Sequence, residues 1–218
     1  MRLDLISFDL DGTLVDTASE IAEAANRTLE SLGLARRATS EITNLIGLGT
    51  HELISKLLDR NVRRQDAFAA MDEHYAAVTA TSAVPYPRCH ETLERVRATG
   101  VRMACVTNKE LRHAIRLLGA FDLTGYFDLV IGGDSLAEKK PHASVLSSVA
   151  RVLDAAVERS AHVGDSSIDV AAARNSGMAA WAVSYGYNAG VPIAAARPDR
   201  IFDELSEVAD LMLTANDS

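Results

Sequence analysis

The sequence predicts an α/β protein in which a parallel β-sheet carries helices on both faces and a helical lobe is inserted near the amino terminus. Short apolar runs recur along the chain, each followed by Gly, Asn, Asp or Ser, and helical patterns lie between them. Strands that alternate with helices form parallel sheets covered on both faces. From Val15 to Ala83 helical spacing continues without a convincing strand, so this segment is predicted to be the inserted lobe.

The first predicted strand covers residues 3–8, which are mostly apolar and precede an Asp-Gly turn signal. The helices of the core show apolar residues at helical spacing, as in Leu111, Ile115 and Leu118. Later apolar runs between these helices are interpreted as the remaining strands of the sheet: Val101–Val106, Phe127–Ile131, Ala161–Val163 and Ala179–Val183.

The inserted lobe is predicted to be all-helical. Its first helix carries an apolar stripe from Ile21 to Leu32 and stops near Gly33, as helices commonly do at a glycine. Gly47-Leu48-Gly49 lies between later helical segments and is either a plain turn or a loop that lets the backbone approach a ligand. We expect the core to comprise residues 1–14 and 84–218, and the lobe to comprise residues 15–83.

Length, charge and composition restrict the classes of partner. The chain has 218 residues, a formal net charge of -8 and 48% hydrophobic residues, so it can bury a sizeable core. Nucleic acid or an acidic membrane surface would be repelled, and there is no long basic run or membrane-length apolar segment. Two cysteines and the absence of a secretory signal argue against a disulfide framework. We therefore expect a cytoplasmic monomer or homodimer that binds neither nucleic acid nor membranes.

Acids, a hydroxyl and a lysine follow four of the predicted strands. Asp9 and Asp11 come after the first strand, two residues apart, so an extended backbone would point both to the same side. Thr107 follows the second strand, Lys140 lies after the third, and Asp165 follows the fourth. The carboxyl ends of parallel strands lie along one edge of the sheet, where ligands bind. These side chains are therefore predicted to form one site.

The residue types at this site suit phosphoryl transfer. A carboxylate and a phosphate monoester are both anionic, so the site has to neutralise charge before attack. Asp9, Asp165 and a backbone carbonyl near Asp11 could hold Mg²⁺, a cation that prefers oxygen ligands. Lys140 adds positive charge, and the Thr107 hydroxyl can donate to phosphoryl oxygens. Asp9 would form an aspartyl-phosphate, while Asp11 would give a proton to the leaving group and later take one from water.

Four segments of the chain resemble the motifs of the haloacid dehalogenase-like hydrolases. The resemblance implies a Rossmann-like sheet with strand order 5-4-1-2-3 and an inserted helical cap that closes over the substrate. The segments are Asp9-Leu10-Asp11-Gly12-Thr13, Thr107-Asn108, Lys140-Pro141 and Gly164-Asp165-Ser166-Ser167-Ile168-Asp169.

The resemblance also implies a role for each matching residue. Asp9 is similar to the family's nucleophile and Asp11 to its acid/base residue, and both are expected at the metal site. Asp165 matches a Mg²⁺ ligand, and Asp169 matches an acid that supports the metal site without being a direct ligand. The residues implied to bind phosphate are Thr107, Asn108 and Lys140.

The presence of Asp11 favours phosphatases over the dehalogenase branch, which does not need an acid at that position. Tyr185-Gly186-Tyr187-Asn188 resembles a segment of phosphoglycolate phosphatases, and the loop at Gly47 resembles their cap specificity loop. The resemblance thus implies a phosphatase of a small phosphorylated metabolite, with 2-phosphoglycolate as the leading substrate. His51 and Asn44 flank the cap loop and are candidates to face the carboxylate of that substrate.

Other functions stay open on the sequence alone. A phosphomutase of the β-phosphoglucomutase type would pass the same aspartyl-phosphate to a sugar hydroxyl, and a pyrophosphatase shares much of the motif set. A silent phospho-ligand-binding module on the same scaffold would show no turnover. His142 could be an acid or base but suits a helix start equally, and His162 is interpreted as a core histidine.

Overall fold

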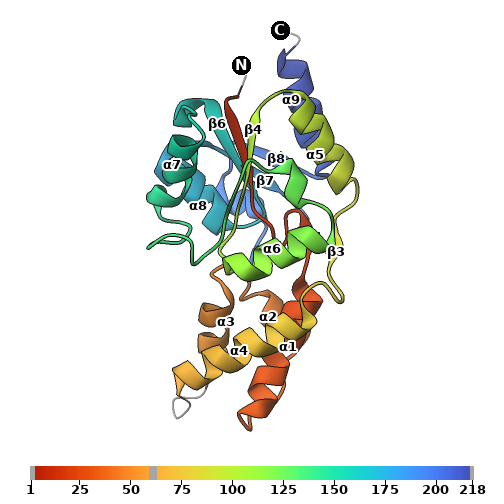
Figure 1. Cartoon of the computed structure of the whole chain (residues 1–218), viewed down its shortest axis with the longest axis vertical. Helices are drawn as coiled ribbons and strands as arrows, with labels where there is room; N and C mark the ends of the chain where they lie inside the picture. Colours follow the sequence, from red (N-terminus) through yellow and green to blue (C-terminus); the bar gives the residue numbers. More distant parts are fainter. Residues whose placement is uncertain (1–2, 59–62, 217–218) are drawn as a thin grey trace.

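The central sheet has six strands, all parallel, in the spatial order β5-β4-β1-β6-β7-β8. The computed structural model describes residues 3–58 and 63–216 (Figure 1). The strands of this sheet are β1 (Leu5–Phe8), β4 (Arg102–Val106), β5 (Leu129–Ile131), β6 (Ser160–Gly164), β7 (Ala179–Val183) and β8 (Arg200–Phe202).

This sheet confirms the predicted α/β class and its Rossmann-like arrangement. Numbered in chain order within the sheet, the strands run 3-2-1-4-5-6, which contains the predicted order 5-4-1-2-3 and adds a strand beside the fifth. The additional strand, β8, was not predicted. It has only three residues, and Arg200 and Ile201 are exposed, so no apolar run marks it in the sequence.

The position of β1 at the centre of the sheet explains its apolar sequence, because helices cover both of its faces. Ile6 and Phe8 belong to the core on one face, and Leu5 belongs to the core on the other. Asp9 follows directly, so it emerges at the middle of the sheet's carboxyl edge. The first face carries α5 (Cys89–Ala98), α6 (Leu111–Ala120) and α9 (Ser206–Asn216), and the second carries α7 (Ala143–Val152) and α8 (Ser167–Ser176). Short 3-10 turns lie at Thr124–Tyr126, Val157–Arg159 and Ile193–Ala196.

A second group of helices packs beyond the carboxyl edge of the sheet and has its own apolar core (Figure 1). Its first helix ends before Gly33, whose φ of 73° is a conformation that glycine adopts without strain. A short antiparallel ribbon, β2 (Val15–Asp16) with β3 (Val84–Pro85), joins this group to the sheet. We propose residues 15–83 as the cap, since the chain leaves and re-enters the sheet region at this ribbon. The cap helices are α1 (Ala18–Ser31), α2 (Thr39–Thr43), α3 (Thr50–Leu57) and α4 (Arg64–Val78).

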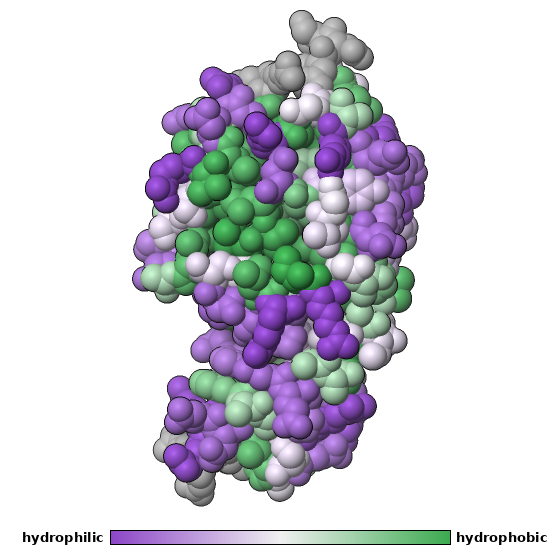
Figure 2. All heavy atoms as spheres, viewed as in Figure 1, coloured by the Kyte–Doolittle hydropathy of each residue, from purple (hydrophilic) through white to green (hydrophobic). Residues whose placement is uncertain are grey.

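The surface differs between the core and the junction with the cap. Hydrophobic side chains gather on the core above α6 in the view of Figure 2, whereas hydrophilic residues cover the band between core and cap.

None of the helices in the described part of the chain is both long and apolar enough to cross a membrane.

Candidate active site

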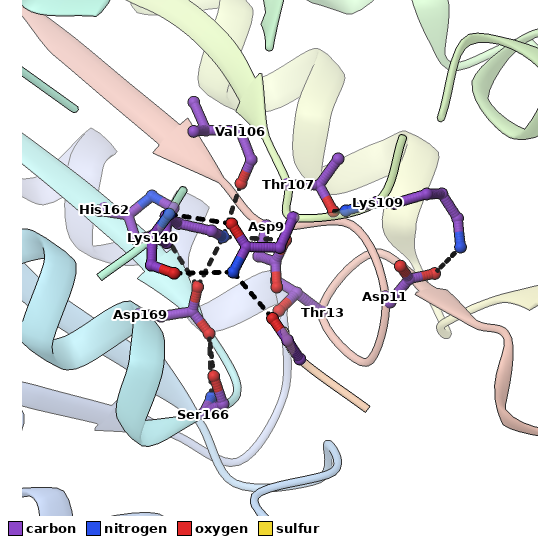
Figure 3. A network of polar contacts seen from close by, with 12 residues as sticks. Asp9, Asp11, Thr13, Val106, Thr107, Lys109, Lys140, His162, Ser166 and Asp169 are labelled. Carbon is purple, nitrogen blue, oxygen red and sulfur yellow. Dashed lines mark hydrogen bonds and ion pairs between the residues drawn. The ribbon is translucent and has the colours of Figure 1, made fainter. Parts of the chain in front are cut away.

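The strand ends bring the predicted site residues together, as the sheet topology requires. Asp9, Thr107 and Asp165 follow β1, β4 and β6 directly, and these strands are neighbours in the sheet. Lys140 reaches the same place from the loop after β5 (Figure 3). A cavity lies between this edge and the cap, and both contribute to its lining: Asp9, Asp11, Ile21, Ile46, Gly47, Gly49, Thr50, Leu53, Thr107, Asn108, Lys109, Asp165, Ser166 and Tyr187.

Three buried carboxylates dominate the charge of this site. Oxygens of Asp9, Asp165 and Asp169 all lie within 4.8 Å of one another. Burial is the largest cause that raises the pKa of Asp9 to about 7, and it also raises the pKa of Asp165 well above its ordinary value. Burial acts in the same direction on Asp169, but Lys140 and His162 outweigh it and lower the pKa of that carboxyl.

Lys140 is the one ammonium group that contacts this acid cluster in the described residues. Its Nζ lies 3.0 Å from Asp9 Oδ1 and 2.7 Å from Asp169 Oδ1, and it donates to the backbone carbonyl of Val106 at 2.6 Å. Burial alone would lower the pKa of Lys140, yet the two carboxylates raise it, so the lysine stays charged. The three acids and one lysine leave an excess of two negative charges when all are ionised.

This site fits a divalent cation. Asp9 Oδ1 is buried and accepts no recorded hydrogen bond among the described residues; its contact there is the 3.0 Å ion pair with Lys140. A hard cation, which prefers oxygen ligands, can bind this carboxylate oxygen and offset the excess negative charge around it.

The oxygens of Asp169 are already occupied. Oδ1 accepts from Lys140 and lies 3.2 Å from His162 Nε2, and Oδ2 accepts from the backbone and side chain of Ser166 at 3.1 and 2.5 Å. Asp169 therefore holds Lys140 and the start of α8 in place, which suits a supporting role better than direct metal ligation.

Glycines make room for Asp165. A Cβ on Gly12 would lie 2.3 Å from Asp165 Oδ2, and a Cβ on Gly186 would lie 2.1 Å from Asp165 Cβ. The carboxylate accepts from the backbone N–H of Tyr187 at 2.6 Å and from the Thr13 hydroxyl at 3.3 Å. The orientation of Asp165 thus depends on residues from two distant parts of the chain.

Thr107 and Asn108 differ in what they can offer a phosphate. The Thr107 hydroxyl accepts from the backbone N–H of Lys109 at 3.2 Å, which leaves its own proton to donate into the cavity. The Asn108 amide donates to the carbonyls of Gly47 and Lys140 at 2.9 and 2.8 Å. Both side-chain donors of Asn108 are therefore used to join the cap loop to the lysine loop.

Asp11 points away from the acid cluster and toward Lys109 (Figure 3). Its Oδ1 accepts from the Thr17 hydroxyl and from Lys109 Nζ, both at 2.7 Å. The side chain lines the cavity but is not a member of the three-acid group. This position is suited to proton transfer at the cap side of a substrate.

Two of the cap residues expected near a substrate, Gly47 and His51, are placed differently. Gly47 lines the cavity, whereas His51 does not. His51 Nε2 lies 3.0 Å from Asp72 Oδ1, and its ring stacks on Phe68 with centroids 4.5 Å apart. The prediction that His51 faces the substrate is not supported, because these partners hold the ring within the cap.

Two other histidines have structural surroundings. His142 precedes α7, and its Nδ1 accepts from the backbone N–H of Ser144 at 3.2 Å, so it starts a helix. His162 is fully buried in β6, with Nδ1 at 2.9 Å from the Ser7 hydroxyl. Its other nitrogen faces Asp169, so this core histidine also helps to orient the acid.

Two features of the site were not assigned from the sequence. Lys109 was visible in the strand-end segment after β4, but nothing in the sequence showed what its ammonium group contacts. Tyr187 lies in a segment singled out earlier, yet its dual contact was not foreseen. Its backbone holds Asp165, while its hydroxyl accepts from the backbone N–H groups of Thr17 and Ala18 at 2.8 and 3.1 Å.

The geometry can be compared with known proteins. The sequence profile described as haloacid dehalogenase-like hydrolase matches residues 6–183. The chain belongs to this family. A phosphoglycolate phosphatase of Vibrio parahaemolyticus is 33% identical over 219 aligned positions, which cover 96% of each protein. Another, from Aliivibrio fischeri, is 36% identical with 93% of each protein covered.

Solved structures agree with this membership of the haloacid dehalogenase-like hydrolases. The crystal structure of a predicted phosphoglycolate phosphatase from Haemophilus somnus matches with a TM-score of 0.91 at 30% identity, covering 97% of this chain and 98% of that one. CbbY from Rhodobacter sphaeroides in complex with phosphate matches with a TM-score of 0.82 at 26% identity, covering 95% and 96%. The predicted family and its phosphoglycolate phosphatase-like branch are confirmed.

Proposed function

We propose that this chain is a Mg²⁺-dependent phosphatase that hydrolyses 2-phosphoglycolate through an aspartyl-phosphate on Asp9. The observation that supports this most is the surrounding of Asp9, whose buried Oδ1 has no hydrogen-bond donor and lies 3.0 Å from a buried ammonium group. A carboxylate oxygen that accepts no hydrogen bond and lies next to positive charge can approach an anionic phosphorus centre.

The cation would be held by Asp9, Asp165 and the backbone carbonyl near Asp11, and it would supply the positive charge that offsets the nucleophile and phosphate. Asp9 forms the new O–P bond while the bond to the substrate's oxygen breaks. Asp11 gives its proton to the departing alkoxide. In the second step Asp11 takes a proton from water as the water attacks phosphorus, which releases phosphate and restores the Asp9 carboxylate.

Phosphate recognition in this proposal comes from the core. The Thr107 hydroxyl donates to the phosphoryl oxygens, Lys140 supplies positive charge next to Asp9, and Asn108 holds the loop that carries Lys140. Asp169 keeps the lysine charged and oriented through the 2.7 Å ion pair. These side chains are fixed before substrate arrives, which favours stabilisation of the transition state.

The cap wall supports a small organic group on the substrate. Ile21, Ile46 and Leu53 give it an apolar lining, and the hydroxyl of Thr50 already donates to Glu110 at 2.9 Å. A sugar ring would need several polar partners there, which makes a hexose phosphomutase less suited to this cavity. Relatives named phosphoglycolate phosphatase point the same way. We also propose the cytoplasm as the location, in keeping with the sequence.

The test is phosphate release from 2-phosphoglycolate with and without Mg²⁺. Asp9→Asn should lower kcat by at least about 1,000-fold, because the amide is not a nucleophile. Asp122→Asn is the matched control, since this exposed residue has a φ of 53° that asparagine also tolerates. Unchanged turnover in Asp9→Asn would remove Asp9 from its role, and isomerisation of a hexose 1-phosphate with little free phosphate would indicate a mutase instead.

A further inference from the structure

The cavity between core and cap has a single cationic side chain among its described lining residues. This residue is Lys109, and the acids of the lining are Asp9, Asp11 and Asp165. Lys140, the other buried lysine of the site, has its Nζ 3.0 Å from Asp9 Oδ1 and is not part of the lining. Lys109 is therefore the one ammonium group that a bound substrate could meet away from the phosphate end.

The ammonium group of Lys109 is held by both halves of the molecule. Its Nζ lies 2.7 Å from Asp11 Oδ1 in the core and donates to the hydroxyl of Tyr75 in the cap at 2.5 Å. The same Nζ lies 4.6 Å from the centroid of the Tyr75 ring. The Tyr75 hydroxyl in turn donates to Glu20 Oε1 at 3.1 Å, so the phenol oxygen is turned to accept from the lysine.

The third N–H donor of Lys109 has no recorded partner among the described residues. An ammonium group has three N–H donors, and the described structure records side-chain partners for two of them, Asp11 and Tyr75. The side chain is 1% exposed, so water satisfies the third donor poorly. A buried charged donor without a partner is costly, and an anionic acceptor in the cavity would remove that cost.

The other described residues that line the cavity include no second positively charged donor. Ile21, Ile46 and Leu53 are apolar, and Thr50 is committed to Glu110. An anionic group on the organic part of a substrate would be buried against this wall, where only a charged hydrogen bond offsets its desolvation. Among the described lining residues, Lys109 alone can make that bond.

We propose, on the basis of the function proposed above, that Lys109 binds a carboxylate of the substrate and selects small phosphorylated acids over neutral phosphate esters. Asp11 fixes the ammonium group from the core side. Tyr75 fixes it from the cap side, so recognition of the acid requires the closed arrangement of core and cap. Lys109 is thus a specificity-determining residue, and Tyr75 is a positioning residue.

The experiment compares two substrates, one with and one without a carboxylate on the organic group. Both 2-phosphoglycolate and ethyl phosphate carry the phosphate on a two-carbon group, but ethyl phosphate has a methyl group in place of the carboxylate. The measured quantity is the ratio of their kcat/KM values within one variant. Both substrates need Asp11 for proton transfer, so damage to Asp11 lowers both values and largely cancels in the ratio.

Lys109→Met should lower this ratio by about 10-fold to 100-fold, the range expected for a hydrogen bond to a charged group. Lys109→Gln keeps N–H donors for Asp11 but has no charge, so it should lower the ratio by a similar factor. This variant provides the test if Lys109→Met does not fold. Tyr75→Phe should lower the ratio less, and mainly through KM for the acid. Lys139→Met is the matched control, because Lys139 lies beside Gly49 but does not line the cavity.

The outcomes separate the two proposals. An unchanged ratio in folded Lys109→Met or Lys109→Gln overturns the assignment, whatever happens to the absolute rates. A wild-type protein that hydrolyses both substrates equally overturns it as well, while the phosphatase function stands. A wild-type protein that hydrolyses neither substrate contradicts the proposed function itself.

Discussion

At the scale of single residues, Asp165 lies very close to the backbone of Gly186, and the missing side chain of this glycine permits the approach. A Cβ at position 186 would lie 2.1 Å from Asp165 Cβ and 2.3 Å from its Oδ2, distances that force a shift. The neighbouring N–H of Tyr187, which donates to the same carboxylate, would move as well. The acid would then lose the orientation in which it can bind a cation.

Gly186→Ala should therefore raise the Mg²⁺ concentration needed for half-maximal activity by about 10-fold to 100-fold, as removal of other groups that orient metal ligands does. Titration of phosphatase activity with Mg²⁺ measures this. Gly119→Ala in α6 is the matched control, because no atom lies within 4 Å of a Cβ there. Equal Mg²⁺ dependence in the two variants would show that the close approach of Gly186 does not matter.

Individual residues also show where prediction from the sequence works. The acids and Lys140 could be located because polar residues directly after buried strands have a readable meaning in a parallel sheet. Tyr75 could not be located in this way. It lies on an apolar stripe with Met71 and Val78 and is fully buried, so its sequence pattern indicates core. Only the packing of α4 on the core shows that its hydroxyl meets Lys109.

At the scale of secondary-structure elements, the first cap helix begins with a buried acid. Glu20 lies in the first turn of α1, where a carboxylate is favourable next to the helix N-terminus. It accepts from the Tyr75 hydroxyl at 3.1 Å and from the backbone N–H of Ala80 at 2.8 Å, which ties α1 to the end of α4. Burial, the largest cause, raises the pKa of Glu20 above its ordinary value of 4.5.

Glu20 should make the cap less stable as the pH rises. A raised pKa means that the folded protein holds the proton more tightly than the unfolded chain, so stability is fully present below pH 4.5 and is lost as the pH rises through the folded pKa. Glu20→Gln removes this loss. The free energy of unfolding of both proteins is measured by urea denaturation. The difference between variant and wild type should shift in favour of the variant as the pH rises above 4.5.

The matched control for this experiment is Glu52→Gln, which removes one acidic charge from an exposed position in the first turn of α3. The comparison uses the change with pH, because glutamine cannot accept from both Tyr75 and Ala80 and will lower stability at every pH. A difference between Glu20→Gln and wild type that stays constant across the pH range contradicts the linkage.

Element prediction from the sequence failed where no periodic signal exists. The strand β8 and the ribbon of β2 with β3 are two or three residues long, too short for a pattern. The long helices and the central strands were predictable because burial imposes a clear period on their apolar residues. The proposed boundary of the cap rests on the place in the sequence where the alternation of strands and helices stops.

At the scale of the whole molecule, one segment of the core makes a series of side-chain contacts to the described part of the cap. Residues 108–116 contact the cap through Asn108 to Gly47, Lys109 to Tyr75, Glu110 to Thr50, Arg112 to Asp72 and Arg116 to the carbonyl of Ala76. The segment starts at the phosphate-binding strand end and runs into α6. Contacts of this kind depend on how two groups of elements with separate apolar cores meet, so the sequence pattern of either group contains no signal for them.

The charge balance of the whole site gives a prediction for stability. Asp9, Asp165 and Asp169 are buried with one ammonium group, so folding without a cation keeps uncompensated negative charge out of water. Mg²⁺ bound only to the folded state should stabilise it by about 2.7 kcal/mol at 100 times the dissociation constant. For a chain of this length that corresponds to a rise in Tm of about 5–10 °C.

Thermal unfolding with Mg²⁺, with EDTA, and with NaCl at matched ionic strength measures this rise. Asp165→Asn is the informative variant, because the amide oxygen can still accept from Tyr187 and its N–H can meet the Thr13 hydroxyl. In EDTA this variant should melt above wild type, since one repelling charge is gone, and Mg²⁺ should raise its Tm much less. Two results together would contradict this prediction: wild type has the same Tm in EDTA as in Mg²⁺, and Asp165→Asn has no higher Tm than wild type in EDTA. In that case the three carboxylates do not carry the excess negative charge that a cation would have to offset.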